Sequence, residues 1–202
     1  MEKSPIYRWK LSHEPVVDFL MSKIWNPGGP ALDVFADYAG VVEWLRHIGT
    51  LSAEDARSQK ALAGKRPGEA RAAWKKAVRL RNAGYAVFSA CADRRPPPGR
   101  DVEFLNREVA AAMSHLRIAQ SSGKYTWTWH TSGAALAWIL WPVMRAMAEL
   151  LTSDRLHRVK QCAECRWMFM DRSRNASRRW CSMTVCGNRV KARRYHERHR
   201  GS

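Results

Sequence analysis

The sequence lacks a run of apolar residues that is long and clean enough to cross a membrane. The most apolar stretch, Ala134–Leu151, is of marginal length and contains Arg145, Glu149 and Pro142, whereas a spanning helix needs about 20 predominantly apolar residues. Charged residues interrupt the first 25 residues as well, which argues against the apolar core of a secretory signal peptide. We therefore expect a soluble, cytoplasmic protein with no membrane partner.

The motifs of common enzyme classes are also absent. The chain has no G-x-G-x-x-G, no P-loop, no H-E-x-x-H and no G-x-S-x-G. Acidic residues are few and scattered, which disfavours a two-metal nuclease, and the pair Asp33 and Asp37 is an ordinary helical spacing. No Gly-X-Y period or longer internal repeat occurs, so collagen-like and solenoid folds are excluded. We expect that the chain is not an enzyme.

The residues that are present predict a folded and strongly basic protein. The 202 residues are 46% hydrophobic and include ten Trp, which is enough apolar surface for one domain with at most a small satellite. The formal charge of +17 is unevenly spread, because 155–200 holds 14 basic and three acidic residues, and 12 of the 14 are Arg. Clustered Arg is typical of a nucleic-acid-binding surface, although a merely solubilising surface is an alternative.

Four of the five cysteines form a metal-ligand pattern. Cys162, Cys165, Cys181 and Cys186 give the spacing C-x2-C-x15-C-x4-C, which suits tetrahedral zinc held by two close pairs. Four thiolates would leave no open position, so we expect one structural zinc ion. Disulfides are disfavoured without a secretory signal, and a redox role is disfavoured because no βαβ pattern surrounds the first pair.

The residues around these cysteines carry a longer pattern. Cys162–Met183 reads C-x2-C-x-W-x-F-x-D-x-S-x-N-x-S-R-R-W-C-S-M, and Cys186–Arg189 reads CGNR. This segment resembles the bacterial CGNR zinc-finger family, whose finger usually follows an N-terminal ABATE domain. The stretches EPVVDFL and DYAGVVEWLRHIGTLS resemble conserved parts of that domain. The resemblance implies a stress-induced transcriptional regulator whose N-terminal body senses a small molecule or a partner.

The fold is expected to be mainly α with a small β-hairpin: a helical body over 1–153 and a small four-cysteine finger over 154–202. Apolar periodicity predicts helices over 16–24 and 41–48, and a Ser52–Asp55 capping box predicts the start of the next helix. Further helices are predicted from Pro67 through Phe88 and from an Asp101 cap through Met113. A last body helix is predicted from Ser132 to Thr152, with a kink at Pro142. The lone Cys91 reads as a small buried hydrophobe.

Alternating residues predict one hairpin in the body. Leu116 and Ile118 alternate with polar residues before a Ser-Ser-Gly turn, and Tyr125, Trp127 and Trp129 alternate with threonines after it. The aromatic face could stack on bases or close a ligand cavity, but packing against the helices is the more ordinary role of buried aromatics.

The finger is predicted to consist of a hairpin between the cysteine pairs and a basic helix after them. Trp167, Phe169 and Trp180 should pack around the metal. We expect the finger to need zinc for folding, because a segment of about 40 residues cannot bury enough surface to fold alone. The helix should start near Gly187–Asn188, with Asn188 as a cap, and run to His199. His157, His196 and His199 are not expected to bind zinc, because four cysteines complete the ligand set.

The basic side chains of this finger are the candidate nucleic-acid contacts. They are Arg172, Arg174, Arg178, Arg179, Arg189, Lys191, Arg193, Arg194, Arg198 and Arg200. On the helix, Arg189, Arg193, His196 and Arg200 share one face, and Arg189 and Arg193 are expected nearest the bases of DNA in a major groove. The favoured function is a zinc-dependent DNA-binding regulator. An RNA- or ribosome-associated protein and a zinc-stabilised protein-interaction module remain alternatives.

Overall fold

The computed structural model describes residues 12–24, 32–133 and 135–199. The helices are α1 (Pro15–Leu20), α2 (Tyr38–His47), α3 (Ala53–Lys65), α4 (Pro67–Ala92), α5 (Gly99–Met113), α6 (Trp141–Leu151) and α7 (Asn188–His199). The strands are β1 (Lys23–Ile24), β2 (Leu32–Asp33), β3 (Leu116–Ser121), β4 (Lys124–Trp129), β5 (Val159–Gln161) and β6 (Met168–Met170), paired in order as antiparallel hairpins. The expected class, mainly helical with small hairpins, is confirmed.

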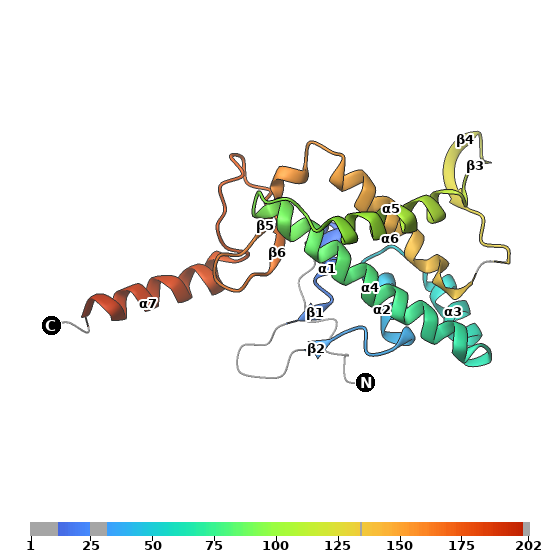
Figure 1. Cartoon of the computed structure of the whole chain (residues 1–202), viewed down its shortest axis with the longest axis horizontal. Helices are drawn as coiled ribbons and strands as arrows, with labels where there is room; N and C mark the ends of the chain where they lie inside the picture. The colour runs from blue at the N-terminus through green and yellow to red at the C-terminus, as the bar shows by residue number, and fades with distance from the viewer. Residues whose placement is uncertain (1–11, 25–31, 134, 200–202) are drawn as a thin grey trace.

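Helix α4 is the centre of the body. It contacts α1, α2, α3 and α5, and it runs through the middle of the molecule in Figure 1. Its inner face is built from small and apolar residues such as Ala77, Leu80 and Phe88, all of which are fully buried. Gly84 on the same helix allows close packing, because a Cβ atom there would lie 2.7 Å from Cδ2 of Leu20. Small residues on α4 therefore set how closely its neighbours approach.

The predicted helix starts are partly right. The hydroxyl of Ser52 accepts a hydrogen bond from the backbone N–H of Asp55, and Pro67 begins α4. Asp101 is not the cap of α5, however. The helix begins at Gly99 after Pro98, and Asp101 lies in its first turn, where a carboxylate still favours the positive end of the helix dipole.

The helix predicted from Ser132 to Thr152 is wrong in its first half. A short 3-10 helix, Leu136–Leu140, precedes α6, and Pro142 lies in the first turn of α6. Proline suits that position because its missing N–H would have no partner there, so Pro142 lies in the first turn of a helix that begins at Trp141 and does not kink a longer one. Within the described ranges, no helix is both long and apolar enough to pass through a bilayer.

The helix predicted through Ile24 is also too long. Helix α1 has only six residues, and Lys23 and Ile24 form strand β1 opposite Asp33 and Leu32. The carbonyl of Ser22 accepts a hydrogen bond from the backbone N–H of Val34 at 3.0 Å. Pairing with β2 therefore stabilises Lys23 and Ile24 in an extended conformation and prevents α1 from continuing.

The β3–β4 hairpin is confirmed, but most of its aromatic face is not packed on the helices. Ser122 and Gly123 form the two-residue turn, both with positive φ (50° and 77°), as a type I′ turn requires. Trp129 lies against Trp141 with ring centroids 5.8 Å apart, whereas Tyr125 and Trp127 are 72% and 57% exposed. Packing against the body, the favoured role of this face, is therefore wrong for these two aromatic side chains.

The finger shares its core with the body. Val159 on β5 and Met168 and Met170 on β6 are buried in the main hydrophobic cluster, where the hairpin contacts α1 and α4. Cys91 on α4 is half-buried against the same cluster. The hairpin was expected between the two cysteine pairs, and this is wrong: its strands flank the first pair, so Cys162 and Cys165 lie on its turn. Two cysteines separated by two residues can bind one metal only if the turn between them is closed, and pairing of β5 with β6 holds that turn closed.

Candidate metal centre and basic helix

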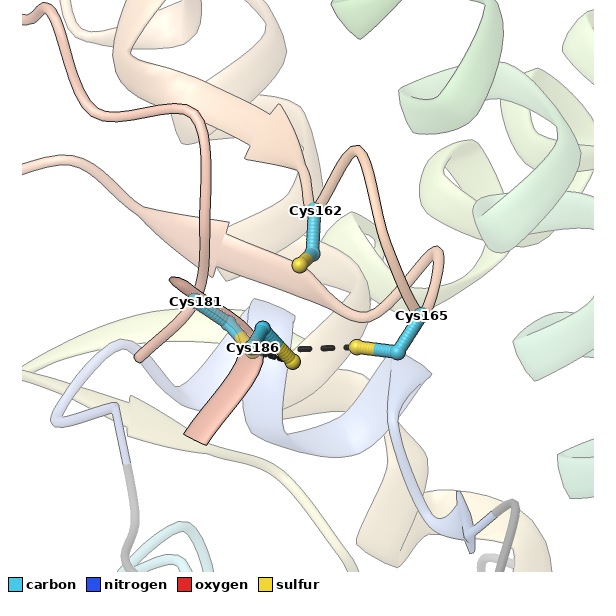
Figure 2. A group of neighbouring side chains, drawn as sticks. All are labelled: Cys162, Cys165, Cys181 and Cys186. Carbon is cyan, nitrogen blue, oxygen red and sulfur yellow. Dashed lines mark hydrogen bonds between the residues drawn. The ribbon is translucent and has the colours of Figure 1, made fainter. Parts of the chain in front are cut away.

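The first cysteine pair lies on a tight turn that closes the β5–β6 hairpin. The backbone N–H of Cys162 donates to the carbonyl of Trp167 at 2.8 Å, and the N–H of Arg166 donates back to the carbonyl of Cys162 at 2.9 Å. Arg166 has φ of 60°, a left-handed conformation that favours glycine. These bonds place Cys162 and Cys165 on one side of the turn (Figure 2).

In the second pair, Cys181 precedes a single turn of π-helix, Met183–Gly187, and Cys186 lies within that turn. This turn accounts for the wider spacing of Cys181 and Cys186. The hydroxyl of Ser182 caps this turn by accepting from the N–H of Val185, and the N–H of Gly187 donates to the carbonyl of Ser182. The amide of Asn188 donates to the carbonyl of Thr184 at 3.2 Å. Asn188 thus braces the metal loop, as expected, but it does not cap α7, because its backbone is already helical and its side chain donates a hydrogen bond to a carbonyl.

The four sulfur atoms converge on one point. All lie within 4.8 Å of one another, and the Sγ atoms of Cys165 and Cys186 are each 3.7 Å from that of Cys181 (Figure 2). Zinc–sulfur bonds of about 2.3 Å at tetrahedral angles give a sulfur–sulfur distance of about 3.8 Å. The cysteines are free, and no pair is close to disulfide length. The donor set therefore fits one zinc ion held by four thiolates.

The thiols have strongly perturbed acidities. Burial acts to raise the pKa of Cys162, but hydrogen bonds from the backbone of Cys165, Cys181 and Glu164 outweigh it and lower the pKa to about 7. Burial, followed by the neighbouring sulfur charges, raises the pKa of Cys181, and burial also contributes most to raising that of Cys186 to about 11. Four thiolates this close repel one another, so the cluster is stable in its charged form only around a cation.

An aromatic shell surrounds the cluster. Phe169 is buried with Cys162 and Cys186, and Trp167 and Trp180 pack against them. These three aromatic residues were expected to pack around the metal, and this is confirmed. They exclude water from one side of the thiolates and raise the energetic value of the metal–sulfur bonds.

Asp171 organises the loop between the two cysteine pairs. The side chain is fully buried. Its carboxylate accepts hydrogen bonds from the N–H and hydroxyl of Ser173 and from the N–H of Arg178, at 2.7 to 3.0 Å, and it pairs with the ammonium of Lys160 at 3.1 Å. Burial acts to raise its pKa, but these partners outweigh it and hold the pKa well below the usual range. The sequence pattern contained Asp171 without revealing this role.

The comparisons with known families agree with this geometry. Residues 158–199 match the family described as "CGNR zinc finger", and residues 13–154 match ABATE, described as "Putative stress-induced transcription regulator". The chain belongs to the ABATE family. It carries a CGNR zinc finger whose four cysteines can hold one zinc ion. A search of curated proteins found no match.

Two of the four loop arginines of the CGNR finger, Arg172 and Arg178, donate hydrogen bonds within the protein. Arg178 donates to the carbonyls of Trp180 and Cys181 and lies over the ring of Phe169. Arg172 donates to the carbonyl of His13 at 2.9 Å, and Arg179 lies 5.7 Å from the ring of Trp180. Arg172 and Arg178 therefore use some of their guanidinium N–H groups to stabilise the finger itself.

Helix α7 of this ABATE chain carries five exposed basic residues within 12 positions. Only Val190 is buried among its described side chains, and Arg189, Lys191 and Arg194 are exposed. Figure 1 shows α7 extending away from the rest of the molecule, at the end opposite the β3–β4 hairpin. Arg200, another candidate contact, lies outside the described residues.

Arg193 and Arg198 are engaged within the chain. The two terminal nitrogens of the Arg193 guanidinium each donate to one oxygen of the Glu164 carboxylate at 2.9 Å, which joins α7 to the turn between Cys162 and Cys165. The Nε atom of Arg198 donates to the carbonyl of Arg194. Arg193 was expected to lie nearest the bases together with Arg189; the structure gives it a partner that DNA phosphates would have to share or displace.

The histidines lie apart from the cysteine cluster. The ring nitrogens Nδ1 of His157 and His199 contact the backbone carbonyls of Asp154 and Tyr195. Within the described part of the chain, the metal-binding group contains cysteine only.

Proposed function

We propose that the chain is a zinc-dependent, DNA-binding transcriptional regulator of bacteria. In this role the CGNR finger contacts duplex DNA, and the helical ABATE body over 1–153 senses a small molecule or a partner. The match to a family described as transcription regulators and to a zinc finger supports the regulatory part of this proposal. Since DNA is the partner, we place its action in the cytoplasm, at the nucleoid, and assign it no enzymatic step.

The exposure of α7 is the observation that carries DNA binding. A helix that buries only Val190 gains little from packing on its own protein. It holds five Arg or Lys residues and one Glu in 12 residues, so its charges repel one another until an anion neutralises them. The major groove is about 12 Å wide and admits one α-helix. Duplex DNA would supply both the groove and the phosphates.

Two surfaces of the finger would contact DNA differently. We assign Arg189 and Lys191, near the start of α7, to the groove or its phosphate edges. Arg174 and Arg179, exposed on the loop between the cysteine pairs, would bind flanking phosphates. The zinc ion would act structurally by holding this loop and α7 in one orientation.

Fluorescence anisotropy of a labelled DNA duplex, titrated with zinc-loaded protein at several salt concentrations, tests this function. The expected log–log salt slope is about −4 to −8, since each phosphate contact releases counterions. R189A and K191A should each reduce the steepness of that slope by about 1. R57A and R71A remove the same charge from exposed positions on α3 and α4 and should leave the slope unchanged.

Three results would contradict the proposal. Equal weakening by all four substitutions would show that net charge alone, and not the finger, drives binding. Stronger binding of a structured or single-stranded RNA at the same salt would favour the RNA-associated alternative. Binding to neither nucleic acid at low salt would leave the protein-interaction module as the better description.

A further inference from the structure

A cavity of about 680 Å³ is lined by residues of both the body and the zinc finger. One wall is formed by Leu20 and Met21 at the end of α1 and by Tyr85 on α4, and the opposite wall is Cys165 and Trp167 of the finger. This volume lies within the range of about 300 to 1,000 Å³ that is usual for small-molecule sites. The cavity is mostly apolar where these side chains face each other, so it suits a ligand with a hydrophobic body.

The polar groups of this cavity are mainly hydrogen-bond donors. Lys23 and Asn82 line it, and among the described residues Lys23 has no carboxylate within ion-pair distance. The hydroxyl of Tyr85 accepts from the amide of Gln161 at 3.0 Å, which leaves the hydroxyl proton free to be donated. An ammonium, an amide and a hydroxyl on one side favour an anionic oxygen group.

Arg81 is a fixed part of the cavity floor and not its anion receptor. It is 3% exposed, and its two terminal nitrogens bond the carboxylate of Asp33 at 2.5 and 2.8 Å. It also lies 4.9 Å from the ring of Phe35. Arg81 pairs with Asp33, and the lining residue Arg166 pairs with Asp93. Lys23 lies opposite Asp33 in the β1–β2 pair. Burial acts to raise the pKa of Asp33, but the hydrogen bonds and charge of Arg81 outweigh it, and the charge of Lys23 helps to lower the pKa. Because Asp33 is already paired with Arg81, we assign the recognition of a ligand's negative charge to Lys23.

The finger side of the cavity connects directly to the metal and to α7. Cys165 is a zinc ligand of the cluster described above, and its neighbour Glu164, also in the wall, holds Arg193 of α7. Arg166, the next wall residue, pairs with Asp93 beyond the end of α4 at 3.0 Å. A molecule that packs against this wall would restrain the turn from which Cys165 binds zinc.

We propose that this cavity binds a small amphipathic anion, of the class of aromatic carboxylates or sulfonates, and that its occupancy slows the loss of zinc from the finger. The carboxylate or sulfonate would lie near Lys23 and the hydroxyl of Tyr85, and the apolar body between Met21 and Trp167. This assignment rests on the proposed function, in which the body senses a small molecule. It identifies the class of ligand and the route by which binding reaches the finger.

The first experiment measures binding of 8-anilinonaphthalene-1-sulfonate to the zinc-loaded protein by fluorescence, with uncharged N-phenyl-1-naphthylamine as the matched probe. K23A, at an exposed position, and Y85F, which keeps the ring, should each weaken the sulfonate about fivefold, as expected for one ion pair or one hydrogen bond. K23A should leave the affinity of the uncharged probe unchanged. The control W127A removes the exposed aromatic side chain of the distant hairpin and should have no effect.

The second experiment follows zinc transfer to the chelator 4-(2-pyridylazo)resorcinol. Saturating sulfonate should slow the transfer severalfold in the wild type, and K23A should show the same slowing only at correspondingly higher probe concentration. Probe binding that is lost in W127A but kept in K23A and Y85F would overturn the cavity assignment. An unchanged rate of zinc transfer in the probe-saturated protein would overturn the link to the finger. Neither measurement involves DNA, so failure of DNA binding would contradict the proposed function without altering these results.

Discussion

Replacing Asp171 by Asn should destabilise the finger more than almost any other single polar substitution in it. The buried carboxylate accepts three hydrogen bonds and one ion pair, divided between its two oxygens. Asparagine keeps one accepting oxygen and turns an NH2 group toward the remaining donors, so two donors lose their acceptor. At about 1–3 kcal/mol for each unsatisfied buried group, we expect a loss of about 3 kcal/mol.

Urea denaturation of the zinc-loaded protein, followed by tryptophan fluorescence, measures this loss. D154N serves as the control, because Asp154 is exposed and the same substitution there should change the free energy of unfolding by less than about 0.5 kcal/mol. Zinc affinity should fall in D171N as well, since the loop that carries Cys181 would lose its anchor. A D171N protein as stable as D154N would refute the central role of Asp171.

The pH dependence offers an independent check on Asp171. Its pKa is lowered in the folded state, so its contribution is fully present above the unfolded-state pKa of about 3.9 and is lost as pH falls through the folded pKa. The difference in stability between wild type and D171N should therefore be constant between pH 6 and 8. A difference that changed over this range would show that the carboxyl group titrates there and is not stabilised as described.

Further substitutions test the metal site and the packing of the body. C181S should reduce bound zinc, measured by metal analysis after dialysis, because three thiolates no longer close the coordination shell, whereas C91S should leave the stoichiometry at one. G84A should lower the free energy of unfolding by about 1 kcal/mol, since the strain of a methyl group 2.7 Å from buried Leu20 exceeds the gain in helix propensity. G64A meets no atom within 4 Å and should be neutral or stabilising; a loss equal to that of G84A would refute the packing argument.

Local chemistry was predictable wherever neighbouring residues decide it. Ser52 and Pro67 mark helix starts because capping and proline geometry depend on the next few residues alone. The spacing of the cysteines predicted the ligand set for the same reason, since two close pairs of cysteines suit one tetrahedral zinc ion. The Ser122–Gly123 turn likewise follows from its own backbone preferences.

The errors came from competition between equally possible local states. The periodicity through Ile24 was compatible with a helix, but a strand partner far along the chain, β2, stabilised the extended state instead. Tyr125 and Trp127 looked like core residues because aromatics are usually buried. In the described structure α6 reaches this face through Trp141, which packs on Trp129, and through Arg145, which lies 5.3 Å from the ring of Trp127. Tyr125 and Trp127 nevertheless remain exposed. Burial depends on the arrangement of distant segments, which periodicity does not encode.

The sequence by itself determined the residue types that this protein presents: four cysteines spaced for one zinc ion, an arginine-rich C-terminal segment and a helical body with an apolar core. The tertiary structure alone decided which charges are available. In the fold, Arg193 forms an ion pair with Glu164 and Arg81 forms one with Asp33. Helix α7 extends away from the body (Figure 1). The fold also places Cys165 in the wall of a cavity. Which carboxylate a given arginine pairs with depends on the distance between segments that are remote in the sequence, and only folding sets that distance.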